Sequence, residues 1–566
     1  MGQFEFQVRT PSAYSSSRLQ TDPLPEAEGI KRMLKVLVLA CTLLLVTPLV
    51  ALAGDPTGTE TGRASDVVAA NPAAPTLQEV AAEVGHGKIA SNFTWILLAS
   101  FLVMFMQAGF AFCETGFTRA KNASHTMAMN LMVYGIGLLG YWACGYALQM
   151  GGVGAVAALG GTGPLASEYT ITIAGHSFGL FGTKGFFLSG DAYDVSVFGL
   201  FLFSMVFMDT AATIPTGAMA ERWKWGSFVV YALFMSMLIY PIFGNWVWGG
   251  GWLSQLGKEF GLGHGHVDFA GSSVVHLVGG VAAFAGARIL GPRIGKYEKD
   301  GRVNLIPGHN MPMAILGVLI LAFGWFGFNA GSTLSGGDLR IAVVAVNTML
   351  GSAAGAVAAM VTITWFRGKP DLSFMANGML AGLVAITAPC AFVNSTGAVL
   401  IGLIAGVLLV GATIFVEHRL KIDDPVAAIS VHGFNGAWGV LAVGLFADGT
   451  YGLGLNGVAG GVRGLFYGGG MSQLTAQIIG AVVCIAFSFT AFHVFFKIVD
   501  YLIGNRVSTA VELEGLDMAE VGVLAYPEFL PAPAVMVTQP EVIPVAASSG
   551  VPILGEELAV AKANAG

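Results

Sequence analysis

Residues 268–276 read Asp-Phe-Ala-Gly-Ser-Ser-Val-Val-His, and residues 424–432 read Asp-Pro-Val-Ala-Ala-Ile-Ser-Val-His. Each stretch opens a long apolar segment and places a histidine eight residues after an aspartate. Ionisable residues are costly to bury in a membrane, so they usually mark a pathway, a proton relay or a cofactor site. Two matching stretches in separate halves of the chain predict a duplicated membrane architecture with one polar point near its midplane.

The composition is that of a chain that crosses a membrane several times. Of its 566 residues, 55% are hydrophobic and only 11% are charged, and the mean hydropathy is +0.71. A soluble domain carries about 25% charged residues. The net charge of -7 argues against nucleic-acid binding. The five cysteines show no CxxC spacing, so we expect neither a disulfide framework nor a zinc site.

The amino-terminal residues predict a secretory signal peptide. A lysine precedes an apolar run over residues 36–52, and a small-residue cleavage site lies just before Gly54. We therefore expect translation to start at Met33, with residues 1–53 forming an extension and a cleaved signal peptide. Residues 54–90 then form an extracellular segment. The alternative is an additional helix that is not cleaved.

Eleven further apolar segments are long enough to cross about 30 Å of hydrocarbon. They lie at residues 93–113, 126–149, 196–219, 227–249, 269–290, 311–331, 340–366, 373–393, 396–416, 427–447 and 474–498. A cleaved signal peptide leaves the N-terminus outside, and an odd number of crossings places the C-terminus inside. The sequence thus predicts an all-α membrane domain over residues 91–498 and a cytoplasmic tail over residues 499–566.

Lysine and arginine residues support this orientation, because cytoplasmic loops are enriched in them. The loops predicted to face the cytoplasm contain Arg119, Lys121, Arg222, Lys224, Arg293, Lys296, Lys299, Arg302, Arg367, Lys369, Arg419 and Lys421. The loops predicted to face outward contain only Lys184, Lys258, Arg340 and Arg463.

The odd number of segments also predicts an internal symmetry. The first five and the next five segments fit inverted five-helix repeats, with the eleventh added as a final helix. The two Asp-x7-His stretches open the fifth and tenth segments, which are equivalent under that symmetry. Inversion places Asp268 at the outer face and Asp424 at the inner face. Each histidine then lies about two helical turns deep.

Six short motifs occur in order along the apolar segments. They are Phe-Met-Asp-Thr-Ala-Ala-Thr at 207–213, Gly-Ala-Met-Ala-Glu-Arg at 217–222, Trp-Gly-Gly-Gly at 248–251, Asp-Phe-Ala-Gly at 268–271, Gly-Trp-Phe-Gly-Phe-Asn-Ala-Gly-Ser at 324–332, and Asp-Asp-Pro through Val-His-Gly at 423–433. Together they resemble the ammonium transporter (Amt/Mep/Rh) family, bacterial Amt branch, over about residues 93–526. The resemblance implies ammonium transport for nitrogen uptake by a homotrimer in the cell inner membrane.

The resemblance implies an outer ammonium site formed by Trp248, Phe207 and Ser332. Ammonium is a small, strongly hydrated cation, so such a site needs aromatic faces and an oxygen acceptor to replace the lost water. Below this site, Phe203, Phe207 and Phe328 match the aromatic gate of the family. The alternatives from single residues are an interfacial tryptophan and ordinary apolar packing.

His276 and His432 match the twin-histidine pair of the family pore. Imidazole titrates near neutral pH and has two distinct nitrogens, so a pair can share a proton and pass it on. We expect an apolar pore that conducts ammonia and rejects hydrated Na⁺ or K⁺, while the proton moves separately. Electrogenic transport and electroneutral ammonia conduction both stay open. A structural histidine is the alternative for either residue alone.

The two aspartates have supporting roles by the same resemblance. Asp268 is expected to hold local structure and to lend negative potential to the outer site without touching the ion. An aspartate also suits the amino-terminal end of a helix, and both roles can hold together. Asp424 is expected to act as a helix cap near the cytoplasmic mouth.

The tail contains a stretch that resembles the cytoplasmic regulatory motif of the family, at Arg506, Gly515, Asp517 and Tyr526. In the family this segment couples the subunits of the trimer, and PII-type signalling proteins dock nearby. Val521 and Val523 depart from the family pattern.

No enzymatic activity, cofactor or metal site is expected. No nucleophile motif or HExxH pattern occurs. His264 and His266 have HxH spacing, but no third ligand is evident, so we expect them in a solvated outer loop. His493 is expected to be structural.

Two alternatives to transport stay open. The first is an ammonium sensor that keeps the pore and signals through a partner protein, since no kinase or cyclase domain follows the last apolar segment. The second, from a different class, is a b-haem redox membrane subunit with His276 and His432 as axial ligands. Close packing along glycine-lined helices leaves little room for haem.

Overall fold

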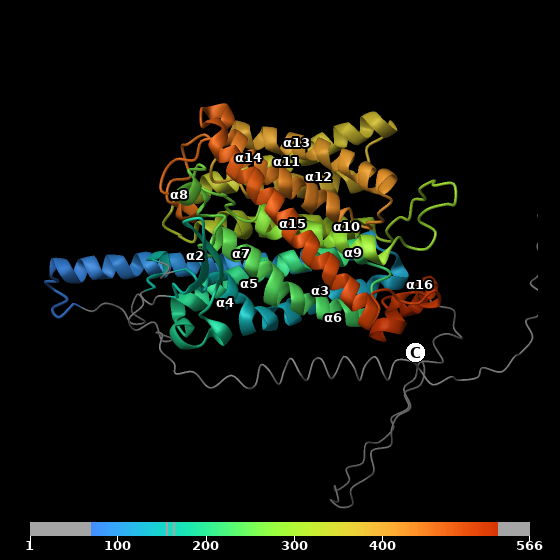
Figure 1. The fold of residues 1–566 in the computed structure, drawn as a ribbon, viewed down its shortest axis with the longest axis horizontal. Helices are drawn as coiled ribbons and strands as arrows, with labels where there is room; N and C mark the ends of the chain where they lie inside the picture. The colour runs from blue at the N-terminus through green and yellow to red at the C-terminus, as the bar shows by residue number, and fades with distance from the viewer. Residues whose placement is uncertain (1–68, 154–156, 162–164, 530–566) are drawn as a thin grey trace, which may run out of the picture. The chain divides into compact units, whose positions relative to one another are not determined.

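The structure is a computed structural model that describes residues 69–153, 157–161 and 165–529. The expected signal peptide and its cleavage site lie outside the described residues. The chain divides into two compact units, residues 1–525 and 526–566. In the first unit, helices lie side by side in one bundle (Figure 1). In the second, the described residues form a short 3-10 turn, Pro527–Phe529.

The first helix, α2, is longer than its apolar segment. It runs over Leu77–Phe117, or 41 residues, which is about 60 Å at 1.5 Å per residue. The Thr76 side chain accepts the Glu79 backbone N–H, and the Glu79 carboxylate accepts the Thr76 backbone N–H. This capping box starts the helix within the expected extracellular segment. The amino-terminal part of α2 projects beyond the other helices (Figure 1).

The remaining apolar segments of the first half are also helical. They form α3 (Ala123–Gly140) with α4 (Tyr146–Met150), α5 (Val195–Met219), α6 (Trp225–Phe234) with α7 (Tyr240–Trp248), and the π-helical turn Ser272–Leu277 with α9 (Val278–Leu290). A β-hairpin of β1 (Glu168–Ile173) and β2 (His176–Gly182), and the short helix α8 (Leu256–Phe260), belong to the two long loops predicted to face outward.

The second half repeats this succession of helices. It contains α10 (Met311–Asn329), α11 (Ile341–Arg367), α12 (Leu372–Thr387), α13 (Ser395–Ile414), the π-helical turn Ile429–Phe434 with α14 (Asn435–Phe446), and α15 (Gly470–Leu502). In the part of the chain that the structure describes, ten helices are long and apolar enough to cross a membrane, and α12 is a shorter apolar helix. The expectation of a helical membrane protein is therefore confirmed, with the β-hairpin of β1 and β2 as an addition that the sequence did not predict.

Helix α12 ends before its expected boundary at residue 393. Pro389 follows closely, and proline cannot continue a helix. The carbonyls of Thr387 and Ala388 accept the backbone N–H groups of Ala270 and Phe269, at 3.2 and 3.3 Å. Non-helical backbone at membrane depth requires such burial in protein. The end of α12 thereby supports the stretch that begins at Asp268.

Helices α2 and α10, which open the two expected repeats, pack directly on each other. Small residues permit this close approach between backbones. A Cβ atom added to Gly116 of α2 would lie 2.5 Å from the backbone nitrogen of Ala314 in α10. The first helices of the two expected repeats are thus direct neighbours.

Candidate functional site

Asp268 organises the backbone at one end of the site. Its Oδ1 accepts the N–H groups of Gly271 and Ser272, both at 2.9 Å. Its Oδ2 accepts the N–H groups of Ser273 and Val274 and the Ser273 hydroxyl, at 2.7, 3.0 and 2.6 Å. The expected cap is therefore present, and one buried carboxylate fixes the π-helical turn that carries His276.

Asp424 has the corresponding position before the second π-helical turn. Its Oδ2 accepts the N–H of Ile429 at 2.7 Å, and its Oδ1 accepts the N–H of Val426 at 3.4 Å. Burial raises the pKa of Asp424 to about 6, although the hydrogen bond from Ile429 opposes that rise. Asp424 therefore accepts backbone N–H groups before and at the start of this turn, as a helix cap does.

The structure brings the two histidines into contact. Nδ1 of His276 and Nδ1 of His432 lie 3.1 Å apart. The ring centroids are 5.2 Å apart and the ring planes are inclined by 26°. Both rings are buried, and each belongs to a π-helical turn, a local form that is frequent at functional sites. Their direct contact leaves no room for a haem between them, which disfavours the redox alternative.

Four aromatic side chains that the sequence singled out form one cluster, here named the aromatic cluster: Phe203, Phe207, Phe328 and Trp248. Phe207 stacks on Phe328 with centroids 4.1 Å apart, and it contacts Phe203 at 4.6 Å. Trp248 meets Phe207 edge to face at 6.1 Å. Phe328 in turn stacks on His276 at 5.5 Å. The aromatic cluster therefore borders the histidine pair on the His276 side.

Hydrogen bonds to the backbone orient Trp248 and Ser332. Nε1 of Trp248 donates to the carbonyl of Asp268 at 2.7 Å, so the indole is tied to the same stretch that the Asp268 carboxylate organises. The Ser332 hydroxyl donates to the carbonyl of Phe328 at 2.7 Å. Because its proton is used in that bond, the Ser332 oxygen keeps its lone pairs for another donor.

Sequence reasoning missed the residues that surround the histidines. Trp325 stacks on His276 at 5.3 Å, and its Nε1 donates to Thr387 Oγ1 at 2.9 Å. Phe110 lies 6.2 Å from His432 between ring centroids. Trp325 belongs to the motif at 324–332, which signalled the family but gave this residue no role. Phe110 belongs to an apolar segment in which a single aromatic residue usually only packs, so it carried no signal of its own.

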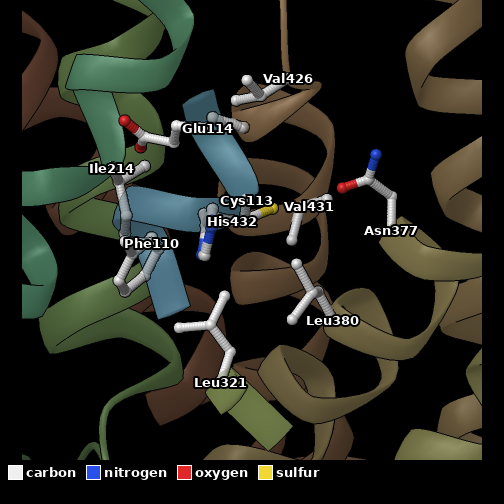
Figure 2. Close-up of a pocket in the computed structure, with 11 residues that line it drawn as sticks. Phe110, Cys113, Glu114, Ile214, Leu321, Asn377, Leu380, Val426, Val431 and His432 are labelled. Carbon is white, nitrogen blue, oxygen red and sulfur yellow. The ribbon is translucent and has the colours of Figure 1, made fainter. Parts of the chain in front are cut away.

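A cavity lies on the His432 side of the pair, with about 320 Å³ of empty space that includes space open to solvent. It is lined by Phe110, Cys113, Glu114, Ile214, Leu321, Asn377, Leu380, Val426, Ala428, Val431 and His432. Figure 2 shows Glu114 and Asn377 on opposite sides of it, with His432 between them. Glu114 did carry a signal, since a carboxylate directly follows the expected segment 93–113. The expected segment ended before Glu114, whereas α2 continues to Phe117.

The HxH pair does not behave as expected. His266 is 2% exposed, and its Nε2 lies 2.9 Å from Ser273 Oγ, which also donates to Asp268. The prediction of a solvated loop is therefore wrong for His266. Among the residues that the structure describes, no group of histidine, cysteine and acidic side chains could hold a metal ion.

A buried ion-pair network lies beside Asp424. Arg293 binds Asp423 through Nε and Nη2 at 2.8 and 2.9 Å, and its Nη1 binds Glu221 at 2.7 Å. Arg119 pairs with Glu221 as well. Burial alone would raise the pKa of Asp423, but Arg222 and Arg293 outweigh it and hold that pKa below its ordinary value.

Three of the four expected tail residues contact the bundle. Arg506 binds the Glu512 carboxylate and the carbonyl of Leu290 at the end of α9, the latter at 2.9 Å. Asp517 accepts the N–H of His125 in α3 at 2.9 Å. A Cβ atom added to Gly515 would lie 2.5 Å from the carbonyl oxygen of Lys121. The fourth residue, Tyr526, belongs to the second unit.

The model of a protein family described as Ammonium Transporter Family matches residues 94–526. The chain belongs to this ammonium transporter family. The ammonium transporter Amt2 of Archaeoglobus fulgidus is 46% identical over 492 residues, which cover 86% of this chain and 95% of that protein. The ammonium transporter Amt1 of Haloferax mediterranei is 39% identical, over 78% of this chain and 80% of that protein.

Solved structures give the same family. A chain described as "Sensor Amt Protein" is 38% identical, with a TM-score of 0.65 and coverage of 77% of this chain and 99% of that chain. Mep2 of Candida albicans is 28% identical, with a TM-score of 0.62 and coverage of 77% and 90%. The relatives support ammonium transport by a multi-pass membrane protein, and they are transporters rather than enzymes.

Proposed function

We propose that this protein moves ammonium across the cell inner membrane by recruiting NH₄⁺ at the aromatic cluster and conducting NH₃ and a proton past the histidine pair. The observation that carries the proposal is the stack formed by Phe207, Phe328 and His276, which continues into the contact between His276 and His432. We infer a narrow path that begins at the aromatic cluster, where the cation is recognised. It continues to the paired imidazoles, where protons are exchanged.

Recruitment depends on Trp248, Phe207 and Ser332. An indole face attracts a cation with about 0.5–2 kcal/mol, and the backbone hydrogen bond of Trp248 holds that face in place. The Ser332 oxygen supplies an acceptor for an ammonium N–H. Asp268 acts through structure, because its two carboxylate oxygens are engaged by five donors of its own segment.

Selectivity follows from the constriction beneath the site. Phe207 and Phe328 are 2% and 0% exposed, so a hydrated cation finds no polar group there to replace its water. Ammonium can pass the constriction because it can release a proton and cross as neutral ammonia. Na⁺ and K⁺ have no neutral form that could do so. The proton is then carried by the histidine pair, so each ammonium moves one charge.

The membrane topology and assembly belong to the same proposal. Eleven crossings, with α12 as the eighth, place the N-terminus outside and the tail inside. The packing of Arg506, Gly515 and Asp517 on the ends of α3 and α9 supports a regulatory tail. We propose a homotrimer whose tail lies where a PII-type protein can dock.

The test is the current produced by the reconstituted full chain on a solid-supported membrane after an ammonium pulse, with K⁺ as the ionic control. Trp248→Leu should raise the ammonium concentration for half-maximal current about two- to thirty-fold, the equivalent of 0.5–2 kcal/mol. Trp246→Leu is the matched control, since Trp246 lies on the same helix and donates to the carbonyl of Leu180 instead. Equal effects of both variants would contradict the outer site.

An ammonium sensor is the second candidate function. The observation that favours it is the 38% identity to the chain described as a sensor Amt protein, 99% of which is covered. An ammonia-uptake pH assay on the same vesicles distinguishes transport from sensing. Ammonia flux without current would indicate electroneutral conduction, and the absence of both current and flux would favour the sensor.

A further inference from the structure

We propose that the Glu114 carboxyl group is the inner proton-exchange site of this protein, where ammonia that has passed His432 regains a proton. The proposal rests on the proposed function and adds to it a residue and a step. It concerns the cavity beyond the histidine pair, a region to which the sequence motifs assigned no role.

Glu114 is a carboxyl group buried near the end of a membrane-spanning helix. It is 3% exposed, and its Oε2 accepts hydrogen bonds from Asn130 Nδ2 of α3 at 2.8 Å and Thr216 Oγ1 of α5 at 2.7 Å. An ionisable residue at such a place is expensive and usually functional. The two donors come from separate helices, and both favour the charged form without removing the capacity to bind a proton.

Glu114 shares the cavity with His432. Its carboxylate turns toward α5, where Thr216 holds it, while the rest of the side chain lines the cavity (Figure 2). A Cβ atom added to Gly217 would lie 2.9 Å from Oε1, and the same atom would collide with Val426, another wall residue. Oε1 therefore lies beside the cavity wall that leads to the Asp424 cap.

The cavity has room for about one small molecule. The space open to the centre of a water molecule is about 20 Å³, and about 10–15 Å³ of such space holds one water. One water or ammonia molecule therefore fits in the cavity that His432 and Glu114 both line. Phe110, Leu321 and Leu380 make the remaining wall largely apolar, and Glu114, His432 and Asn377 are its main polar residues.

The proposed step balances. The O–H bond of the Glu114 carboxylic acid breaks, its electron pair stays on oxygen, and the proton forms a new N–H bond with the ammonia lone pair. The products are ammonium and the Glu114 carboxylate. The carboxylate is protonated again by the proton that ammonium released at the outer site, which the histidine pair passes into the cavity. No oxidant, reductant or co-reactant is needed.

A purely structural role makes a different prediction. If Glu114 only joins α2, α3 and α5 through its hydrogen bonds, then Gln, which has the same shape and keeps a carbonyl oxygen for both donors, should preserve function. If Glu114 exchanges protons, the Glu114→Gln variant should fold but lose the ammonium current, because an amide does not bind and release a proton near neutral pH.

The experiment compares Glu114→Gln, Glu114→Asp and the wild type in the full chain, by current and by ammonia flux on the same vesicles. We expect Glu114→Gln to lower the maximal current at least tenfold, with the half-saturating ammonium concentration unchanged and ammonia flux retained. Glu114→Asp should recover part of the current. Asp209→Asn is the matched control, since it neutralises another buried carboxylate that does not line the cavity.

The outcomes separate the two proposals. A folded Glu114→Gln variant with wild-type current, or with current and flux reduced together, would overturn the role of Glu114 only. Silence of the wild type in both assays would overturn the proposed function and this step with it. If Glu114→Gln does not fold, Thr216→Val is the second test. It removes one donor to the carboxylate, so the pH of half-maximal current should move upward, and an unchanged pH profile would refute the step.

Discussion

Replacing Asp268 by asparagine should destabilise the protein although the two side chains have the same shape. Each carboxylate oxygen of Asp268 accepts two backbone N–H groups, those of Gly271 and Ser272 at Oδ1 and those of Ser273 and Val274 at Oδ2. Whichever way the asparagine amide turns, its NH₂ group faces two donors. Two buried N–H groups therefore lose their acceptor in Asp268→Asn.

The magnitude follows from that count. A buried donor without a partner costs about 1–3 kcal/mol, so we expect a loss of about 2–6 kcal/mol in the free energy of unfolding. The assay is unfolding of the purified protein in detergent, followed by tryptophan fluorescence against temperature and denaturant. The current should fall in parallel, since the same segment carries His276 and holds the Trp248 indole.

Asp209→Asn provides the control for this prediction. Asp209 is 2% exposed and Asp268 is 1% exposed, so the burial is matched. Oδ1 of Asp209 has no hydrogen-bond partner, so its replacement by an amide takes the acceptor from no backbone N–H group, and the amide's own N–H groups are common to both variants. We expect little change. Equal stability of Asp268→Asn and wild type, or equal losses in both variants, would refute the reasoning.

Two further predictions concern Asp423 and Asp424, which precede the second π-helical turn. Asp423→Ala leaves the buried Arg293 guanidinium without its bidentate partner and should lower the free energy of unfolding by about 3–5 kcal/mol. The control is Asp338→Ala, which removes the more exposed pair with Arg340 and should lower that free energy by at most about 1 kcal/mol. Similar losses in both variants would contradict the stabilising role of the buried network. For Asp424, a pKa of about 6 against an ordinary 3.8 means that the folded chain binds the extra proton between these pH values. The wild-type free energy of unfolding should therefore fall by up to about 3 kcal/mol as the pH rises through that window, and Asp424→Asn should remove this fall. The measurement is the free energy of unfolding as a function of pH. The same slope in Asp424→Asn as in the wild type would show the reasoning to be wrong.

Much of the fold could be predicted because long apolar segments in the sequence indicate membrane-spanning helices. Each of the eleven apolar segments is helical, with boundaries mostly within a few residues. The two exceptions have local causes that hydropathy ignores. A polar capping box at Thr76 extends α2 outward, and Pro389 ends α12 early.

The candidate site was only partly accessible to the sequence. Asp268, Asp424, His276 and His432 stood out because charge is rare in apolar segments, and the structure gives them the expected cap positions and contact. The stacking of Trp325 on His276 could not be foreseen, because which face an aromatic side chain presents depends on packing between distant helices. Nor could the burial of His266, which depends on its contact with Ser273 seven residues later.

The contact between the two histidines through Nδ1 on both sides has a kinetic consequence. In a neutral pair, one Nδ1 must carry the hydrogen and the other must accept it, so the two rings hold opposite tautomers. If His276 is the donor, its Nε2 is bare, and His432 carries its one ring N–H hydrogen on Nε2. A proton that enters at His276 and leaves from His432 reverses both tautomers. The pair then presents the wrong polarity to the next proton until that reversal is undone. A protein built this way would turn over in discrete cycles, each with a resetting step, rather than conduct charge as a continuous file of water would.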